Sequence, residues 1–169
     1  MAFDSLAYPN DKSERYALLL DQAHALMDGV SHPMPNLANM AALLFHGMPE
    51  VNWCGFYLMN DGELLLGPFC GLPACVRIPL SRGVCGTAAA TDRVQRVADV
   101  HAFPGHIACD SASNSEIVIP LHAQGRVVGV LDIDSPALNR FDAVDEQSLL
   151  ALVCLLETHC DLEKTGYRL

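Results

Sequence analysis

The sequence predicts an α+β fold in which helices at both ends of the chain pack against a sheet formed by the middle. Apolar side chains recur at helical spacing near each end, as at Tyr16, Leu19 and Ala23 and again at Leu149 and Leu156. The middle contains short β-rich segments separated by turn sequences. Strands joined by short turns pair antiparallel, so we expect an antiparallel sheet.

Two helices are expected before the sheet. The apolar stripe of the first comprises Tyr16, Leu19, Leu20, Ala23 and Met27. Gly29 offers a stop, and a Ser-His-Pro-Met-Pro linker separates the two helices. Asn36 is the expected N-cap of the second helix, which ends near Gly47. The apolar stripe of the second comprises Leu37, Met40, Ala41 and Leu44.

The sheet begins with a predicted hairpin. Residues 51–58 are β-rich and aromatic, and the Asn-Asp-Gly turn at 60–62 leads into the next strand. Trp53 and Tyr57 are four residues apart and therefore share one face of their strand, while Gly55 between them leaves room above the backbone. This arrangement fits a ligand pocket, although two aromatic residues on one face are more often ordinary core.

A proline-containing stretch at 71–80 predicts a short strand at an edge of the sheet. Residues 81–90 then turn into a short Ala-rich helix. Cys85 lies near the start of this helix, where free backbone N–H groups favour a thiolate. Another short strand is expected around Arg96.

The last two strands form a hairpin that makes a specific prediction about carboxylates. If the loop is Ala-Gln-Gly, with Gly125 in the left-handed position, Leu121 pairs with Val127 and Glu116 lies directly opposite Asp132. A loop of even length would shift the register by one residue and send Glu116 to the other face.

Asp134 shares the face of Glu116 and Asp132 in this register, so three carboxylates converge. Like charges in close cross-strand positions destabilise a sheet. A solvated acidic end of the sheet is one interpretation. The other is a functional site in which repulsion and partial burial raise the pKa of at least one acid.

A long C-terminal helix completes the fold. Asp142 is its expected N-cap, and Asp145 takes the third helical position as in a capping box. The buried stripe comprises Leu149, Leu152, Val153, Leu156 and Cys160. Cys154 and Cys160 are expected to be structural. We expect one domain over 1–169, with a loose start (1–12), N-terminal helices (13–47), sheet and catalytic loops (51–134) and the C-terminal helix (142–162).

The loop before the last hairpin contains a candidate reactive thiol, Cys109. Two histidines, a Pro-Gly turn and a Ser/Asn-rich run surround it, a polar setting for a cysteine that only fills a core. A structural cysteine is the alternative, because a reactive thiol must be exposed as a thiolate. The chain has seven cysteines, an odd number, and no Cys-x-x-Cys pair. A disulfide framework and a structural zinc site are therefore poorly supported.

Composition restricts the class of partner. The net charge is -10 over 169 residues, which disfavours nucleic acid and anionic membranes. A cationic or zwitterionic small ligand is compatible with this charge. The N-terminal residues show no signal-peptide pattern and no window is apolar enough to span a membrane, so we expect a soluble, cytoplasmic protein.

Four motifs resemble the free methionine-R-sulfoxide reductases, a GAF-domain family. They are Pro-Ala-Cys75, Gly-Val-Cys85-Gly-Thr-Ala, His-Ile-Ala-Cys109-Asp-Ser-Ala-Ser-Asn-Ser-Glu116 and Leu-Asp132-Ile-Asp134-Ser. The likeness runs from about Val51 to Phe141. It implies a single GAF-like domain with the N- and C-terminal helices on one side of the sheet and a loop and short-helix pocket on the other.

The resemblance also implies a thiol mechanism. Cys109 would attack the sulfoxide sulfur, Cys75 or Cys85 would resolve the sulfenic acid as a disulfide, and thioredoxin would restore the thiols. Cys75 matches the position favoured as the first resolver, whereas Cys70 matches no functional position. The implied external reductant is the thioredoxin and NADPH system, and no bound cofactor or metal is expected.

The family's pocket residues correspond to Trp53, Tyr57, Glu116, Asp132 and Asp134. A sulfoxide is a poor electrophile until its oxygen is protonated or hydrogen-bonded, so the site needs a thiolate and an acid that keeps its proton. We expect Glu116 or Asp134 to be that acid and the remaining carboxylates to bind the ammonium group of the substrate. Trp53 would pack on the S-methyl group. The first and last helices offer a face for a homodimer.

Two other functions fit parts of the pattern. A GAF-type sensor would use the pocket without chemistry, because GAF domains host many functions. A zinc-binding domain would use Cys75, Cys85, Cys109 and His106. The first would bind methionine sulfoxide without turnover, and the second would purify with stoichiometric metal.

Overall fold

The computed structural model describes residues 7–107 and 111–167. The elements in chain order are α1 (Lys12–Met27), α2 (Pro33–Gly47), β1 (Trp53–Asn60), β2 (Glu63–Gly71), β3 (Arg77–Pro79), α3 (Gly83–Thr91), β4 (Gln95–Val97), η1 (Val100–Ala102), β5 (Ser115–Ala123), β6 (Arg126–Ser135), α4 (Ala143–His159) and η2 (Leu162–Lys164). The strands form one antiparallel sheet in the order β3-β2-β1-β6-β5-β4. This is the α+β architecture that the sequence predicts.

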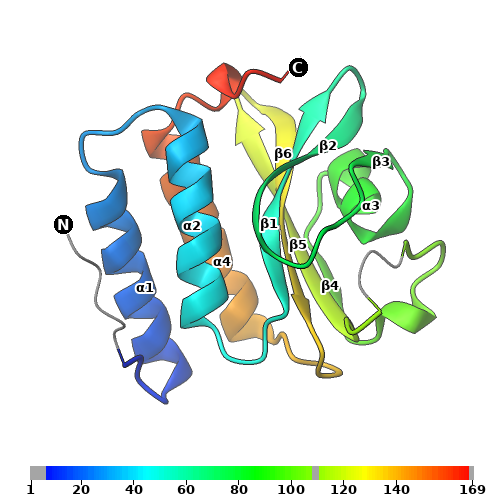
Figure 1. Cartoon of the computed structure of the whole chain (residues 1–169), viewed down its shortest axis with the longest axis horizontal. Helices are drawn as coiled ribbons and strands as arrows, with labels where there is room; N and C mark the ends of the chain where they lie inside the picture. Colours follow the sequence, from blue (N-terminus) through cyan, green and yellow to red (C-terminus); the bar gives the residue numbers. More distant parts are fainter. Residues whose placement is uncertain (1–6, 108–110, 168–169) are drawn as a thin grey trace.

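The two faces of the sheet are covered by different structures (Figure 1). Helices α1, α2 and α4 lie on one side, and α3 with the segments around it lies on the other. Alternation along β1 sends Cys54, Phe56 and Leu58 to the helices and Trp53 and Tyr57 to the opposite face. The arrangement of helices on one side and a loop and short-helix layer on the other is confirmed.

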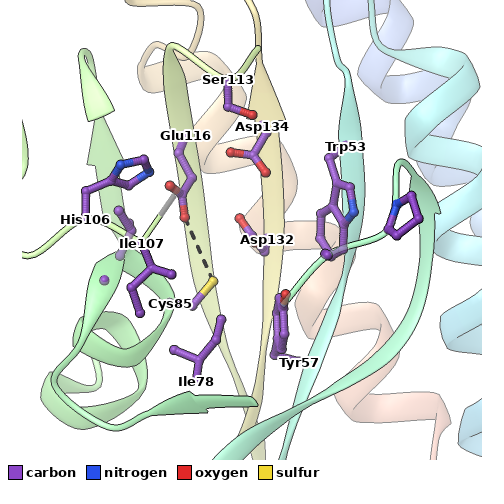
Figure 2. A pocket seen from close by; sticks show the side chains of 14 residues that line it. Trp53, Tyr57, Ile78, Cys85, His106, Ile107, Ser113, Glu116, Asp132 and Asp134 are labelled. Atoms are coloured by element: carbon purple, nitrogen blue, oxygen red, sulfur yellow. Dashed lines mark hydrogen bonds between the residues drawn. The ribbon is translucent and has the colours of Figure 1, made fainter. Parts of the chain in front are cut away.

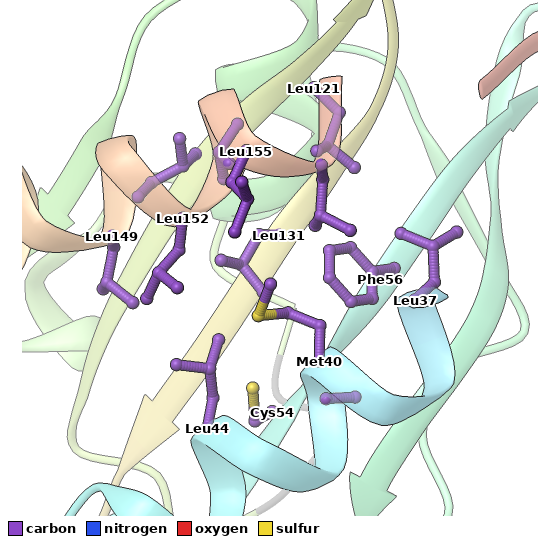
Figure 3. Close-up of a cluster of buried hydrophobic side chains, with 14 of the residues drawn as sticks. Leu37, Met40, Leu44, Cys54, Phe56, Leu121, Leu131, Leu149, Leu152 and Leu155 are labelled. Carbon is purple, nitrogen blue, oxygen red and sulfur yellow. The ribbon is translucent and has the colours of Figure 1, made fainter. Parts of the chain in front are cut away.

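The helix side is a dry apolar core (Figure 3). Leu37, Leu44 and Leu149 from the helices meet Phe56 of β1 and Leu131 of β6, and each is at most 1% exposed. Burying one such side chain contributes about 1.5–3 kcal/mol relative to leaving it in water. This core fixes the central strands β1 and β6, on whose other face the carboxylates stand.

The start of α4 has the predicted capping box. The side chain of Asp142 accepts from the backbone of Asp145, and the side chain of Asp145 accepts from the backbone of Asp142. Asp145 is fully buried and also bonds to Tyr16 Oη at 2.8 Å, Lys12 Nζ at 2.7 Å and Arg140 at 3.1 Å. A buried carboxylate is stable here because both of its oxygens are satisfied.

Two predictions for the helices are wrong. Helix α2 begins at Pro33 with His32 as its N-cap, because a proline at the first helical position lacks the N–H that would need a cap. Asn36 lies inside the helix, where its side chain donates to the carbonyl of Val30 at 2.6 Å. Cys154 is exposed on α4 and is not part of the core, whereas Cys160 is buried as predicted.

The register of the last hairpin also differs from the prediction. The loop has two residues, Gln124 and Gly125, both with positive φ (50° and 74°), as in a type I′ turn. An irregularity between Leu121 and His122 then adds a second shift of one residue. The two shifts add to two residues, so Glu116 pairs with Asp134 instead of Asp132 but stays on the predicted face.

No helix of the described residues is long and apolar enough to cross a membrane.

Candidate active site

A pocket lies on the face of the sheet away from α1, α2 and α4, between α3 and the central strands (Figure 2). Its lining residues are Trp53, Tyr57, Pro73, Ala74, Ile78, Gly83, Val84, Cys85, His106, Ile107, Ser113, Glu116, Asp132 and Asp134. All five pocket residues predicted from the sequence are therefore brought together. Polar and apolar groups share the wall almost equally, and the carboxylates are concentrated on β5 and β6.

Sheet register places the polar and aromatic groups in one row. Asp134 of β6 pairs with Trp53 of β1 on one side and with Glu116 of β5 on the other. In the next row, Asp132 pairs with Gly55. Side chains directly opposite one another in a sheet lie close together, so the carboxylates and the indole share one site.

Glu116 and Asp132 form a buried acid pair. Each residue is only 6% exposed, and a carboxylate oxygen of one lies within 4.8 Å of a carboxylate oxygen of the other. Burial raises the pKa of Glu116 well above its ordinary range, and the negative charges of Asp132 and Asp134 raise it further. Burial also raises the pKa of Asp132, to about 6. Both burial and the neighbouring charges therefore favour the protonated form of Glu116.

One atom of this pair is unsatisfied. Among the described residues, nothing hydrogen-bonds to the buried Oδ1 of Asp132. An unsatisfied buried carboxylate oxygen is unfavourable, and such atoms in a native protein commonly mark a place where a ligand binds. A hydrogen-bond donor or a cationic group entering the pocket would satisfy it.

Cys85 stands over the acid pair at the start of α3. Its Sγ donates to Glu116 Oε1 at 3.9 Å, and it is 4% exposed (Figure 2). Burial raises the pKa of this thiol well above its usual value, and the charges of Asp132 and Glu116 raise it further. The prediction that the helix start favours a thiolate here is wrong, because burial and neighbouring acids outweigh the backbone N–H groups.

Two aromatic rings, those of Trp53 and Tyr57, line the pocket, and Phe69 of β2 packs against Trp53 without lining it. Trp53 lies between Tyr57 (centroids 5.9 Å apart) and Phe69 (5.3 Å), with interplanar angles of 23° and 14°. A Cβ at Gly55 would be 2.6 Å from the Trp53 ring and 2.3 Å from Phe69 Cβ. Gly55 therefore makes room for the indole and Phe69, and the expected open space above its backbone is filled.

The other cysteines considered from the sequence differ in burial and in whether they form a disulfide. Cys75 is half-buried and disulfide-bonded, whereas the five other described cysteines are free thiols. Cys109, the predicted nucleophile, lies outside the described residues. Cys70 sits on β2 opposite Cys54 and does not line the pocket.

Of the wall residues that were not predicted as parts of the pocket, three come from the segment around Cys109: His106, Ile107 and Ser113. Burial lowers the pKa of His106, which lines the pocket beside Ile107. Ile107 packs over Gly83 at the start of α3. The Gly83 N–H donates to the Gly105 carbonyl at 3.2 Å. Ser113 is buried and accepts from Asn52 at 3.1 Å. Their positions next to Cys109 in the sequence are the only signal that could have suggested them.

Of the four residues that the zinc alternative would use, Cys85 and His106 both line the pocket, and Cys109 lies outside the described residues. Cys75 is disulfide-bonded, which removes its sulfur from the donor set. The described side chains that could share a cation are instead Cys85, Glu116 and Asp132, whose ligand atoms lie within 4.8 Å of one another.

Comparison with known proteins gives a family for this site. The GAF domain model matches residues 37–156. The free methionine-R-sulfoxide reductase of Escherichia coli is 55% identical over 147 residues, covering 87% of this chain and 89% of the relative.

Solved structures agree with this result. The reduced form of fRMsr from Staphylococcus aureus superposes with a TM-score of 0.85 at 48% identity, covering 91% of this chain and 99% of that one. Free methionine-R-sulfoxide reductase from Neisseria meningitidis, in complex with its substrate, gives a TM-score of 0.88 at 43% identity and covers 95% and 96% of the two chains.

Proposed function

The chain belongs to the free methionine-R-sulfoxide reductases, oxidoreductases built on the GAF domain, and from this premise we propose that it reduces free methionine-R-sulfoxide to methionine. The observation that carries the proposal is the buried Glu116, whose pKa is raised, beside the unsatisfied Oδ1 of Asp132 in a pocket lined by Trp53. This pocket offers an acid, an acceptor for an ammonium group and an apolar surface for a methyl group.

In the first step, the thiolate of Cys109 attacks the sulfoxide sulfur while an acid protonates the sulfoxide oxygen. Glu116 is the acid, because burial and the neighbouring charges favour its protonated form. The oxygen passes to Cys109 as a sulfenic acid, and methionine leaves. The substrate sulfur is reduced by two electrons and the Cys109 sulfur is oxidised by two.

In the second step, Cys75 attacks the sulfenic acid, releasing water and forming a disulfide. The choice of Cys75 over Cys85 is supported by their environments. Cys85 is buried beside two acids that raise its thiol pKa, and thiols are poor nucleophiles compared with thiolates. Cys75 is half-buried and is found disulfide-bonded.

The pocket also explains a preference for the free amino acid. Asp132 and Asp134 accept hydrogen bonds from the substrate ammonium, a group that an internal residue of a peptide lacks. The Oδ1 of Asp132 is the acceptor without a partner among the described residues. Trp53 packs on the S-methyl group, where its face favours the partial positive charge that develops at sulfur.

The cycle closes when an external dithiol reduces the disulfide, and we assign this role to thioredoxin, itself reduced with NADPH. The protein needs no bound cofactor for these steps, since every electron passes through cysteine sulfur. Such a cycle requires a compartment that keeps thiols reduced, and we therefore assign the protein to the cytoplasm as part of this proposal.

The direct test is NADPH consumption coupled through thioredoxin and its reductase, with the R and S epimers of free methionine sulfoxide supplied separately. We expect turnover of the R epimer alone. The control is Cys109→Ser, which keeps the shape of the side chain but is a far weaker nucleophile and should be inactive. Binding of the R epimer without turnover would contradict the proposal and indicate a sensor.

A further inference from the structure

The segment that carries Cys75 is pinned to the pocket through its backbone. Residues 72–76, which we call the strap, connect β2 to β3. Trp53 Nε1 donates to the Leu72 carbonyl at 3.1 Å, and Tyr57 Oη donates to the Cys75 carbonyl at 2.9 Å. The Leu66 N–H donates to the Val76 carbonyl at 3.0 Å. Three hydrogen bonds within five residues hold the strap in a fixed conformation.

The outer side of the strap is apolar. Leu72 and Val76 are 62% and 61% exposed, more than any other large hydrophobic residue described except Leu138, which equals Val76 at 61%. Single exposed apolar residues are common on protein surfaces. Here, however, two of them flank Cys75, the disulfide-bonded cysteine, within five residues. The Leu72 carbonyl is held by Trp53 of the pocket and the Val76 carbonyl by the backbone of Leu66 on β2, so the backbone that carries both exposed side chains is fixed.

We propose that Leu72 and Val76 form the docking surface for the protein dithiol that reduces the Cys75 disulfide. This inference rests on the proposed function, which requires the disulfide to be reduced in every cycle. A reductant thiolate must reach the Cys75 sulfur to covalent distance, so the surface around that sulfur is buried against the reductant. An apolar rim suits this contact, because desolvating it is favourable whereas desolvating charges is not.

The chemistry of the contact is a thiol–disulfide exchange. The reductant thiolate attacks Cys75 Sγ, and the sulfur bonded to Cys75 leaves as a thiolate. The second thiol of the reductant then attacks the mixed disulfide and releases Cys75, so the reductant ends as a disulfide. Two electrons pass from the reductant to the chain. A small dithiol such as dithiothreitol performs the same exchange but needs no docking surface.

The test compares two reductants in the full-length protein. We expect Leu72→Ser with Val76→Ser to lower kcat/KM for thioredoxin at least about tenfold, as truncation of interface anchors does. Turnover of methionine-R-sulfoxide with saturating dithiothreitol should stay within about twofold of the unaltered chain. The matched control is Leu138→Ser, equally exposed at 61% but distant in sequence from Cys75, which should leave both rates unchanged.

Several results would overturn the inference. One is an unchanged kcat/KM for thioredoxin in the double variant, and another is an equal decrease of that kcat/KM in Leu138→Ser. A third is a parallel decrease of the turnover with dithiothreitol in the double variant, which would mean that the strap acts through the pocket. A change of oligomeric state in the double variant, seen by analytical ultracentrifugation, would assign the surface to a second copy of the chain. Absence of dithiothreitol-driven turnover in the unaltered chain would instead refute the proposed function itself.

Discussion

The two faces of the sheet are built on the same strands but differ in whether their buried carboxylates have hydrogen-bond partners. On the helix side, Phe56 and Leu131 are buried among apolar neighbours, and the buried charge nearby, Asp145, has partners for both oxygens. On the pocket side, Glu116 and Asp132 are buried together and one oxygen of Asp132 has no described partner. The helix side stabilises the fold, and the pocket side carries a cost in stability that serves catalysis.

The largest expected effect is on the pocket side. Glu116→Gln should lower kcat/KM for methionine-R-sulfoxide by about 10²- to 10⁴-fold, because an amide donates a hydrogen bond but cannot transfer the proton. Steady-state kinetics with dithiothreitol measures this, and the thermal midpoint should not fall. The control is Glu14→Gln on the exposed start of α1, which should be fully active. Near-normal turnover of Glu116→Gln would remove Glu116 as the acid.

A variant on the helix side should show the reverse pattern. Phe56 is fully buried between β1 and the helices, so Phe56→Ala should lower the free energy of unfolding by about 3–5 kcal/mol. Urea denaturation followed by circular dichroism gives this value. Val144→Ala, exposed on α4, serves as the reference and should change stability by less than about 0.5 kcal/mol. A loss below about 1 kcal/mol for Phe56→Ala would show that this side is not the main core.

The pH dependence of stability should have opposite signs on the two sides. The pKa of Asp132 is raised to about 6 in the folded state, so the native protein binds more protons than the unfolded chain between about pH 4 and 6. The contribution of Asp132 to stability therefore falls as pH rises through this window. Asp142 on the helix side has a pKa lowered to about 2 by Lys12, and its contribution is lost as pH falls from about 4 to 2.

Thermal unfolding measured across this pH range separates the contributions of Asp132 and Asp142 to stability. Asp132→Asn should remove the decline between pH 4 and 6 and raise the thermal midpoint at pH 7 by a few degrees, since about 1 kcal/mol corresponds to about 2–4 °C in a chain of this size. Asp142→Asn should reduce only the loss at acidic pH. A lower midpoint for Asp132→Asn at pH 7 would mean that the Asp132 carboxylate stabilises the ligand-free fold.

The last hairpin shows how far sequence reasoning reaches. Alternation along β6 correctly places Asp132 and Asp134 on one face, and Glu116 joins them because two register shifts of one residue each add to two. The predicted partner of Glu116 was wrong because the loop has two residues instead of three and because an irregularity at His122 adds a second shift, which depends on tertiary structure. The His122 N–H donates to Glu157 of α4 at 2.7 Å, and no local pattern signals that contact.

The sequence predicts which residues line the pocket, but it does not predict the pKa values of their side chains. The motif residues Trp53 and Tyr57 line the pocket as the resemblance implies. The state of Cys85 was not predictable, because its pKa depends on how deeply α3 packs over Glu116. The use of the space above Gly55 was not predictable either, because Phe69 on the neighbouring strand fills part of it.

We propose that the buried carboxylates of the pocket side recognise the ammonium group of a free amino acid. The most direct measurement is kcat/KM for free methionine-R-sulfoxide and for its N-acetyl derivative, with dithiothreitol as reductant. Acetylation removes a charge-assisted contact and leaves the Oδ1 of Asp132 unsatisfied. We expect it to lower kcat/KM at least about tenfold, which corresponds to about 1.4 kcal/mol. Equal turnover of the two compounds would contradict the claim.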